Sequence, residues 1–307
     1  MSLAKVSIIK GGDPKAITRR ALELIGAREA ISSGDSVLIK PNCIVPKHPS
    51  TGVTTDARVV DGVIDFVKGC GASDIVVGEG GNPETDFAFE VTGIRGVADR
   101  QGVELLNLNK DRAVEVSIGT GLALKKVKIA KTVLESDCII NVPKLKIHHM
   151  AQVTLSIKNL MGVIIGDRGK IMHFKLDEKL VDLANLIRPK LNVIDGIVGS
   201  EMDETMGRPV PMDLVIAGMD MVAVDAVGSA VMGVDPSKVG HIQLAGRRGL
   251  GVSALKKIDV LGEPIGAVRR EFSREFSEEK LKSYGLQYPL SSEDMRNMKR
   301  KFEGRRG

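Results

Sequence analysis

The sequence has little cysteine, few aromatic residues and no tryptophan. Its three cysteines, Cys43, Cys70 and Cys138, are scattered over 307 residues, and no Cys-x-x-Cys pair occurs. This distribution excludes a disulfide framework and leaves no local motif for a ferredoxin-type cluster. Aromatic residues make up 3% of the chain, which leaves few surfaces on which single-stranded nucleic acid could stack.

Long hydrophobic runs are also absent. No stretch of 18 or more apolar residues occurs, and residues 1–10 lack the apolar segment of a signal peptide. We therefore expect a cytoplasmic protein without a membrane partner. The hydrophobic content of 43% is typical of a globular chain with ample material for a core.

The net charge of +5 is concentrated at one end of the chain. Residues 269–307 contain 11 Lys and Arg against 7 Asp and Glu, which is +4 of the total and leaves +1 for the rest. We expect this segment to be a basic, helical C-terminal tail, and residues 1–268 to form one α/β region. The near-neutral α/β region argues against nucleic acid as the main partner.

Short apolar runs alternate with helical patterns along most of the chain. The runs at residues 5–10, 36–42 and 74–80 are rich in β-branched residues and lead into Gly, Pro or Asn, as strands do. Between them, residues 14–31 and 55–68 carry apolar side chains at helical spacing. This order predicts an α/β fold with a mostly parallel sheet and flanking helices.

Residues 103–129 alternate more strictly between polar and apolar side chains, which predicts an antiparallel excursion. Two α/β lobes around a cleft, residues 1–140 and 141–268, are compatible with the pattern, and so is a homo-oligomer. The remaining expected elements are strands at 138–143, 191–199, 213–218 and 257–262, and helices at 178–188, 219–233 and 237–248.

Polar and charged residues follow the predicted strands. Ligands of open parallel sheets bind beyond the carboxyl ends of the strands, so these residues are candidates for a binding site. We predict a cleft for a small anionic molecule, a carboxylate or a phosphate, because positive side chains and amides dominate this set. The predicted binding residues are Lys40, Asn42, Arg58, Lys144, Lys146 and Asn159.

Lys158 lies in the apolar run TLSIKNLMGVII, within a helix expected at residues 151–161. Burial lowers the pKa of a lysine, and a lysine near neutrality acts as a nucleophile, a base or an anion clamp. The alternative is a lysine that reaches solvent from the edge of a buried helix. We predict a catalytic group in which His148 is the acid/base and Lys158 the clamp or covalent anchor. Asp195 or Glu201 would orient a lysine or a cation.

His148 and His149 are adjacent in the sequence. Successive side chains on a strand or helix point in different directions, so we do not expect both to bind one metal ion. A divalent metal is kept open as a cofactor, and an iron–sulfur cluster is disfavoured. The candidate metal ligands are Cys43, His149, His173 and Glu201.

Four segments of the sequence together resemble the domain-of-unknown-function 362 family of archaea and bacteria. They are VLIKPN, NVPKLKIHHMAQVTLSIKNLMGV, DGIVGSE with GRPV, and VAVDAVGSAVMG, within residues 36–250. Many members of that family carry a ferredoxin-like module with cysteines, which implies electron transfer. The sequence shows no such module, so this implication is not carried over.

A weaker resemblance connects the chain with the nickel-pincer lactate racemase group. TTDAR at residues 54–58 is similar to that group's Asp/Thr/Arg segment, and His148 and Lys158 are spaced ten apart like its histidine and pincer-binding lysine. The glycine-rich run before that lysine is TLSI here, and GEGGNP contains no histidine. The resemblance implies the location of the site and not the nickel cofactor.

The interpretation that these observations favour is an enzyme of uncharacterised reaction, isomerase- or redox-related, that acts on a small anion by acid/base chemistry. One alternative is an iron–sulfur or metal-binding redox protein. The other is a module that binds nucleic acid or a protein partner through its basic tail.

Overall fold

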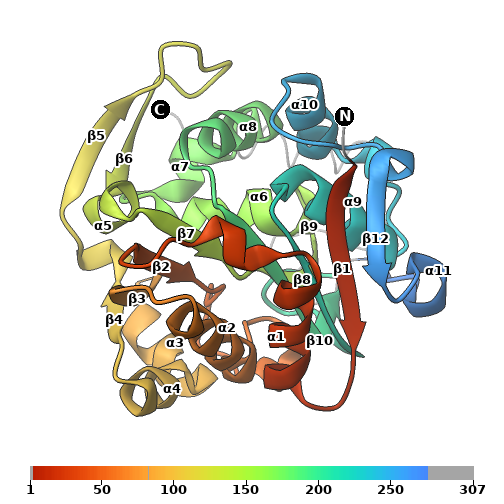
Figure 1. Ribbon diagram of the computed structural model, residues 1–307. Coiled ribbons are helices and arrows are strands. Elements are labelled where there is room, and N and C mark those ends of the chain that lie inside the picture. The colour runs from red at the N-terminus through yellow and green to blue at the C-terminus, as the bar shows by residue number, and fades with distance from the viewer. Residues whose placement is uncertain (1–2, 82, 276–307) are drawn as a thin grey trace.

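The computed structural model describes residues 3–81 and 83–275. A central sheet crosses the molecule with helices on both faces, and a separate two-stranded sheet lies beside it (Figure 1). Across the central sheet the strands are β12 (Ile258–Gly262), β1 (Ala4–Lys10), β11 (Arg208–Gly218), β10 (Leu191–Glu201), β7 (Cys138–Asn141), β2 (Ser36–Lys40), β3 (Asp74–Glu79) and β4 (Glu104–Asn107).

The pairing of these strands is mostly parallel, as the sequence predicts. Strands β7, β2, β3 and β4 pair in parallel, and so do β10 with β7 and β1 with β12. Strand β11 is antiparallel to both β1 and β10. The predicted antiparallel excursion is the pair β5 (Ala113–Ser117) and β6 (Lys126–Ala130), whereas β4 joins the central sheet in parallel.

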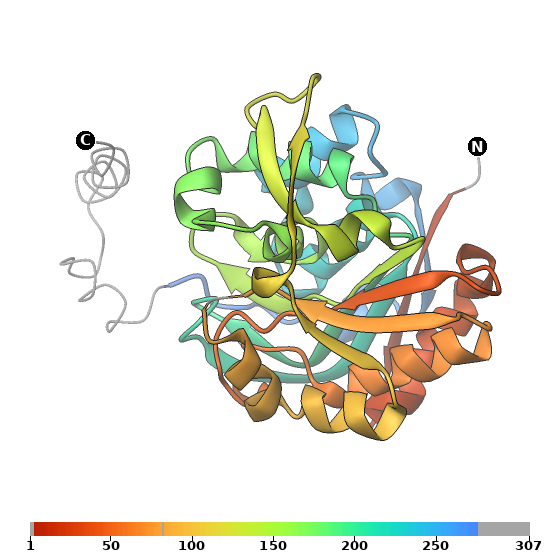
Figure 2. The same ribbon diagram turned by 90° about the vertical axis from the view of Figure 1, so that its left-hand side faces the viewer.

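Helices cover the two faces of the sheet in two groups (Figure 2). One group is α1 (Pro14–Leu24), α2 (Ala57–Gly69), α3 (Thr85–Thr92) and α4 (Ile94–Gln101). The other is α6 (Ser156–Asn159), α8 (Leu176–Leu186), α9 (Met221–Val231) and α10 (Gly240–Arg247). The remaining helices are α5 (Lys131–Glu135), α7 (Arg168–Met172) and α11 (Ile265–Val268), with 3-10 turns at η1 (Ala27–Ala30), η2 (Pro49–Thr51), η3 (Leu108–Lys110), η4 (Leu160–Val163), η5 (Pro236–Lys238) and η6 (Leu255–Lys257).

The strands bury both of their faces because successive side chains point to opposite sides of the sheet. In β2, Val37 and Ile39 pack in the core under α1 and α2, whereas Leu38 packs in the core under α6, α8 and α9. In β11, Val215 and Ile216 divide between the same two cores. This double burial explains why these segments read as continuous apolar runs in the sequence.

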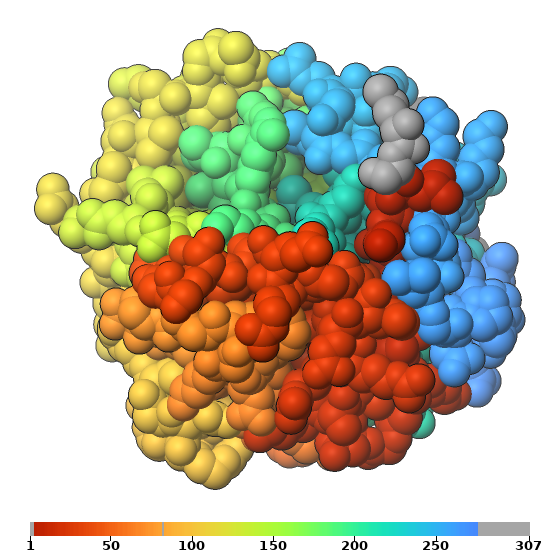
Figure 3. Space-filling view, viewed as in Figure 1, coloured from red at the N-terminus to blue at the C-terminus, as the bar shows by residue number. Residues whose placement is uncertain are grey.

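Strand β1 lies between β11 and β12 and so brings the two ends of the α/β region together. The space-filling view shows residues from near the start of the described chain, in red, beside residues from near its end, in blue (Figure 3). Residues 269–275 continue after α11 without a helix, and the rest of the predicted tail lies outside the described residues. Within the described ranges, every helix is too short or too polar to cross a membrane.

Candidate functional site

A cavity of about 330 Å³ opens where several strands of the central sheet end. Its lining comes from the residues after β2, β3 and β10, from the end of strand β8 (Lys144–His148), and from α6 and α7. This is the carboxyl edge at which open α/β sheets bind ligands. The titratable side chains that line it are Glu79, Lys146, His148, His149, Lys158, Arg168, His173 and Glu204.

Lys158 presents a positive charge to this cavity. Its side chain is half-buried and makes no hydrogen bond or ion pair within the described part of the chain. Burial has the largest effect on the pKa of Lys158 and lowers it, and the charge of the nearby Lys40 lowers it further. The charge of Glu204 acts in the opposite direction, and the resulting pKa is about 8. A lysine in this state is available to bind an anion or to exchange a proton near neutral pH.

Asp225 on α9 fixes the start of the helix that carries Lys158. Its carboxylate accepts hydrogen bonds from the backbone N–H groups of Ser156 (2.7 Å) and Ile157 (2.9 Å). This is the N-terminal capping that a helix needs, provided here from a different element of the fold. The helix is shorter than expected, because residues 152–154 form strand β9 (Gln152–Thr154) and Gln152 has φ +65°.

Replacing Asp225 by asparagine should change how stability depends on pH. Burial raises the pKa of Asp225 from 3.8 to about 6. The folded protein therefore binds more protons than the unfolded chain between these values, and its free energy of unfolding falls as pH rises through them. Between about pH 4 and pH 7, we expect the free energy of unfolding of the wild type to fall by up to about 3 kcal/mol relative to that of D225N. Urea denaturation at several pH values measures this difference. Parallel pH profiles for the two proteins would contradict this cause.

His148 is held in one tautomer. Its Nδ1 accepts hydrogen bonds from the backbone N–H groups of Met150 (3.1 Å) and Ala151 (3.3 Å), so this nitrogen carries no hydrogen. Burial, with the charge of Lys158, lowers the pKa of His148 well below its usual value. A neutral His148 therefore carries its hydrogen on Nε2 and can donate it to a ligand in the cavity.

His149 is held in the opposite way by Glu204. Its Nδ1 lies 2.8 Å from the Glu204 carboxylate, which also accepts from the backbone N–H of His149 (3.3 Å). An ionised carboxylate requires hydrogen on Nδ1, which places the basic lone pair of a neutral His149 on Nε2. Both histidines line the cavity, and in these tautomers Nε2 is a hydrogen-bond donor in His148 and a base in His149.

The expectation that these side chains point apart is wrong. The two rings are stacked, with centroids 4.9 Å apart and planes 12° from parallel. Strand β8 ends at His148 and the chain turns at His149, so the alternation of a strand does not continue between them.

The two rings and Glu204 are also the one group among the described residues that could hold a metal ion, with ligand atoms within 4.8 Å of one another. A metal at Nδ1 of His148 would displace two backbone hydrogen bonds. Of the predicted ligands, His149 belongs to this group, and His173 lines the cavity outside it. Neither Cys43 nor Glu201 belongs to it, so the structure does not bring the predicted ligand set together.

Two amides and a lysine connect the parts of the site. Asn42 donates to Asn159 (2.8 Å) and accepts from Lys146 (2.9 Å). Lys146 also donates to the backbone carbonyls of Val53 (2.7 Å) and Glu204 (3.0 Å), which uses all three of its hydrogens. Burial lowers the pKa of Lys146 to about 7. Through its hydrogen bond to the Glu204 carbonyl, this lysine holds the loop that carries Glu204.

Gly162 lies in the cavity lining against the buried ion pair of Lys40 and Glu79, whose charged atoms are 2.5 Å apart. A Cβ at this position would lie 2.4 Å from Glu79 Oε1 and 2.7 Å from Lys40 Nζ. Glycine is therefore needed here for close approach. The glycines of GEGG serve the same purpose, since Cβ atoms at Gly80 and Gly81 would contact backbone carbonyls at 2.5 and 2.4 Å.

The substitution G162A should therefore lower the free energy of unfolding by about 1–3 kcal/mol, the usual cost of overpacking. Its matched control is G96A in α4, where a Cβ meets no atom within 4 Å and alanine should stabilise the helix by up to about 1 kcal/mol. Thermal denaturation of both variants tests this difference. Equal effects of the two substitutions would show that a Cβ at position 162 does not destabilise the fold through its contacts.

Comparison with known proteins places the chain in a family. The domain of unknown function (DUF362) matches residues 37–230. The chain belongs to the DUF362 family. The thylakoid-associated protein sll1697 of Synechocystis sp. is 28% identical over 278 residues, which cover 86% of this chain and 84% of that protein. This membership confirms the main resemblance seen in the sequence.

A solved structure of the lactate racemase apoprotein from Thermoanaerobacterium thermosaccharolyticum is also similar. The match has a TM-score of 0.45 and 13% sequence identity, and covers 80% of this chain and 57% of that chain. No property of the racemase is transferred to this DUF362 protein.

The structure brings seven of the predicted residues to the cavity of this DUF362 protein and leaves six outside its lining. Those in the lining are Asn42, Lys146, His148, His149, Lys158, Asn159 and His173. Those outside it are Lys40, Cys43, Arg58, Lys144, Asp195 and Glu201. The placement favours binding or chemistry for the first group and structural roles for the second.

The charges outside the lining are paired with neighbours. Lys144 and Asp195 form a fully buried ion pair of 2.7 Å, and Lys40 is paired with Glu79. The remaining partners are Asp56 for Arg58, and Arg208 with the backbone N–H of Ser273 for Glu201. Cys43 lies in the core, where burial raises the pKa of its thiol.

Three charged lining residues, Glu79, Arg168 and Glu204, were not among the predicted site residues. Glu79 directly ends β3 and was visible in the sequence as a strand-end acid. Glu204 lies three residues after Glu201, which ends β10, and only the fold shows which of the two acids faces the histidines. Arg168 donates to the carbonyl of Gly81 and to Asn109, contacts between segments that the sequence does not connect.

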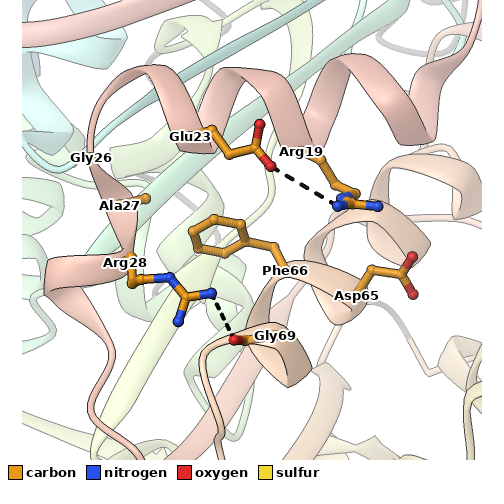
Figure 4. Close-up of a pocket in the computed structure, with 8 residues that line it drawn as sticks. All are labelled: Arg19, Glu23, Gly26, Ala27, Arg28, Asp65, Phe66 and Gly69. Carbon is orange, nitrogen blue, oxygen red and sulfur yellow. Dashed lines mark hydrogen bonds and ion pairs between the residues drawn. The ribbon is translucent and has the colours of Figure 1, made fainter.

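A second hollow lies between α1 and α2 (Figure 4). Its charged side chains are engaged locally, since Arg28 donates to the Gly69 carbonyl (2.8 Å) and Asp65 pairs with Lys15 (2.9 Å). Phe66 lies between them. The lining contains no histidine or cysteine, so this hollow offers less chemistry than the cavity at the sheet edge.

Proposed function

We propose that this DUF362 protein is an enzyme that transfers protons on a small anionic molecule held in the cavity at the sheet edge. The observation that carries the proposal is Lys158, a desolvated lysine that faces the cavity without an ion-pair partner in the described chain. An ammonium group in such a place favours a negatively charged ligand because little water competes for it.

The two histidines supply complementary steps. His148 donates from Nε2 to an oxygen of the bound molecule, and the donation stabilises negative charge that develops there. His149, supported by Glu204, accepts the proton that the molecule loses. Lys158 holds the anionic group, so the same molecule is oriented toward both rings. In this proposal His149 is the base, whereas the sequence predicts that His148 is the general acid/base.

Among the described residues, the cysteines disfavour the iron–sulfur alternative. The three cysteines are all buried, and burial raises the pKa of Cys138 to about 11, which disfavours the thiolate needed to hold a cluster. The basic tail lies mainly outside the described residues. A cytoplasmic location, the small anionic partner and the absence of a nucleic-acid partner are part of the proposal.

The proposal is tested with a panel of small carboxylates and phosphate monoesters in D₂O. Compounds that raise the melting temperature of the wild type are incubated with it, and ¹H NMR then follows exchange of their carbon-bound hydrogens. We expect at least one compound to stabilise the wild type and to exchange, H149A to abolish exchange while retaining binding, and K158M to lose binding. Equal stabilisation of the wild type and K158M by every compound would refute the anion site. Exchange that persists in H149A would refute the assigned base.

A further inference from the structure

A further cavity of about 330 Å³ lies beside α8 and α10 and shares no lining residue with the candidate active site. Three arginines line it, Arg188 after α8 and Arg247 and Arg248 at the end of α10. Leu250 contributes apolar surface to the cavity. All three arginine side chains are exposed, so their guanidinium groups are accessible to a ligand.

No arginine of this group has a carboxylate partner within the described chain. Arg188 donates to the carbonyl (3.3 Å) and the side-chain oxygen of Asn185, and Arg248 donates to the carbonyl of Thr120 (3.4 Å). Arg247 makes no hydrogen bond or ion pair with any described residue. Neutral oxygens thus orient the guanidinium groups of Arg188 and Arg248, and none of the three arginines has an opposite charge as a partner in the described chain.

The one carboxylate in the lining, Asp182, is directed elsewhere. Its two oxygens accept hydrogen bonds from the backbone N–H groups of residues 122–124, at 2.7–2.8 Å. Asp182 is buried and so fixes the β5–β6 hairpin against α8. It is therefore engaged as a structural acceptor and does not pair with the arginines.

The C-termini of two helices lie near the arginines and compensate only part of their positive charge. Each terminus carries about half a negative charge, so α8 and α10 together offset about one of the three positive charges. Even with the full charge of Asp182 counted, about one positive charge remains. A positive surplus on a concave surface attracts an anion.

We propose that this arginine pocket binds a phosphate-bearing small molecule. Guanidinium groups match phosphate oxygens in pairs, and three of them from two segments suit a polyvalent phosphate better than a single carboxylate. The volume is at the lower end of the range for small-molecule sites, and Leu250 provides apolar contact for the remainder of the ligand. The proposal is independent of the function assigned to the other cavity.

The test uses inorganic pyrophosphate, titrated calorimetrically into the full chain at low ionic strength. The wild type is compared with K158M, which removes the unpaired cation of the other cavity, and with R247A. R19A serves as the matched control because Arg19 is an exposed arginine in the hollow between α1 and α2. Circular dichroism verifies that each variant is folded.

We expect K158M and R19A to retain saturable pyrophosphate binding, and R247A to weaken it about tenfold or more, the effect of losing one charge-assisted interaction. R247A is an exposed substitution that removes no internal bond, so its effect reports the pocket. The proposal is overturned if the wild type shows no saturable binding, if R247A binds like R19A, or if binding is lost in K158M alone, which would assign it to the other cavity.

Discussion

Replacing Asp195 by alanine is expected to lower the free energy of unfolding by about 3–5 kcal/mol, the range for breaking a buried ion pair. The carboxylate is fully buried, pairs with Lys144 at 2.7 Å, and accepts from the backbone N–H groups of Asp56 (2.7 Å) and Ile197 (2.9 Å). Without it, Lys144 is a buried charge with no counter-charge, and two backbone groups lose their acceptor. Equilibrium unfolding in urea measures the loss.

The control for D195A is E115A on the β5–β6 hairpin. Glu115 pairs with Lys126 at 3.2 Å with both side chains largely exposed, and such pairs contribute about 0–1 kcal/mol. A D195A variant that unfolds like the wild type would show that Asp195 is not structural, and would return it to the catalytic role predicted from the sequence.

Replacing Lys158 by methionine is expected to weaken binding of small anions in the cavity about 10- to 100-fold, because hydrogen bonds to charged groups contribute about 1.5–3 kcal/mol. Stability should be maintained or increased, since methionine fills a similar volume and removes a desolvated charge. The wild type should also lose anion affinity as pH rises through about 8, the pKa of Lys158. Calorimetric titration across pH measures both effects.

The matched variant for K158M is K170M. Lys170 lies beside the cavity residue Gly169, is 81% exposed, and pairs with Asp167 at 3.4 Å. Solvent screens such a charge, so K170M should bind anions almost as well as the wild type. If K158M and K170M reduce affinity equally, the effect comes from overall charge and not from Lys158.

The fold was largely predictable because the strands are buried on both faces. Short apolar runs such as residues 37–39 and 138–140 are typical of strands that are buried on both faces of a sheet. Helices between such strands imply that the strands pair in parallel. The location of the cavity followed from the same reasoning, since ligands gather at the carboxyl edge of such a sheet. His148 and Lys158 both line that cavity.

Pairing between distant residues was not predictable. In the sequence, Lys40, Lys144 and Asp195 have the same appearance as site residues, because a charge at a strand end is equally suited to a ligand and to a buried partner. Only the fold brings Lys144 to Asp195 and Lys40 to Glu79. The stacking of His148 on His149 depends in the same way on a turn that the local pattern does not specify.

The central claim is that Lys158 is a desolvated lysine without an ion-pair partner in a cavity that binds anions. Competitive acetylation with acetic anhydride across pH, with peptide mass spectrometry, gives the pKa of each reactive lysine in the folded protein. We predict that the reactivity of Lys158 rises with a midpoint at about pH 8, and that anions which stabilise the protein suppress it. A midpoint near the ordinary lysine pKa of about 10.4, unaffected by anions, would contradict the claim.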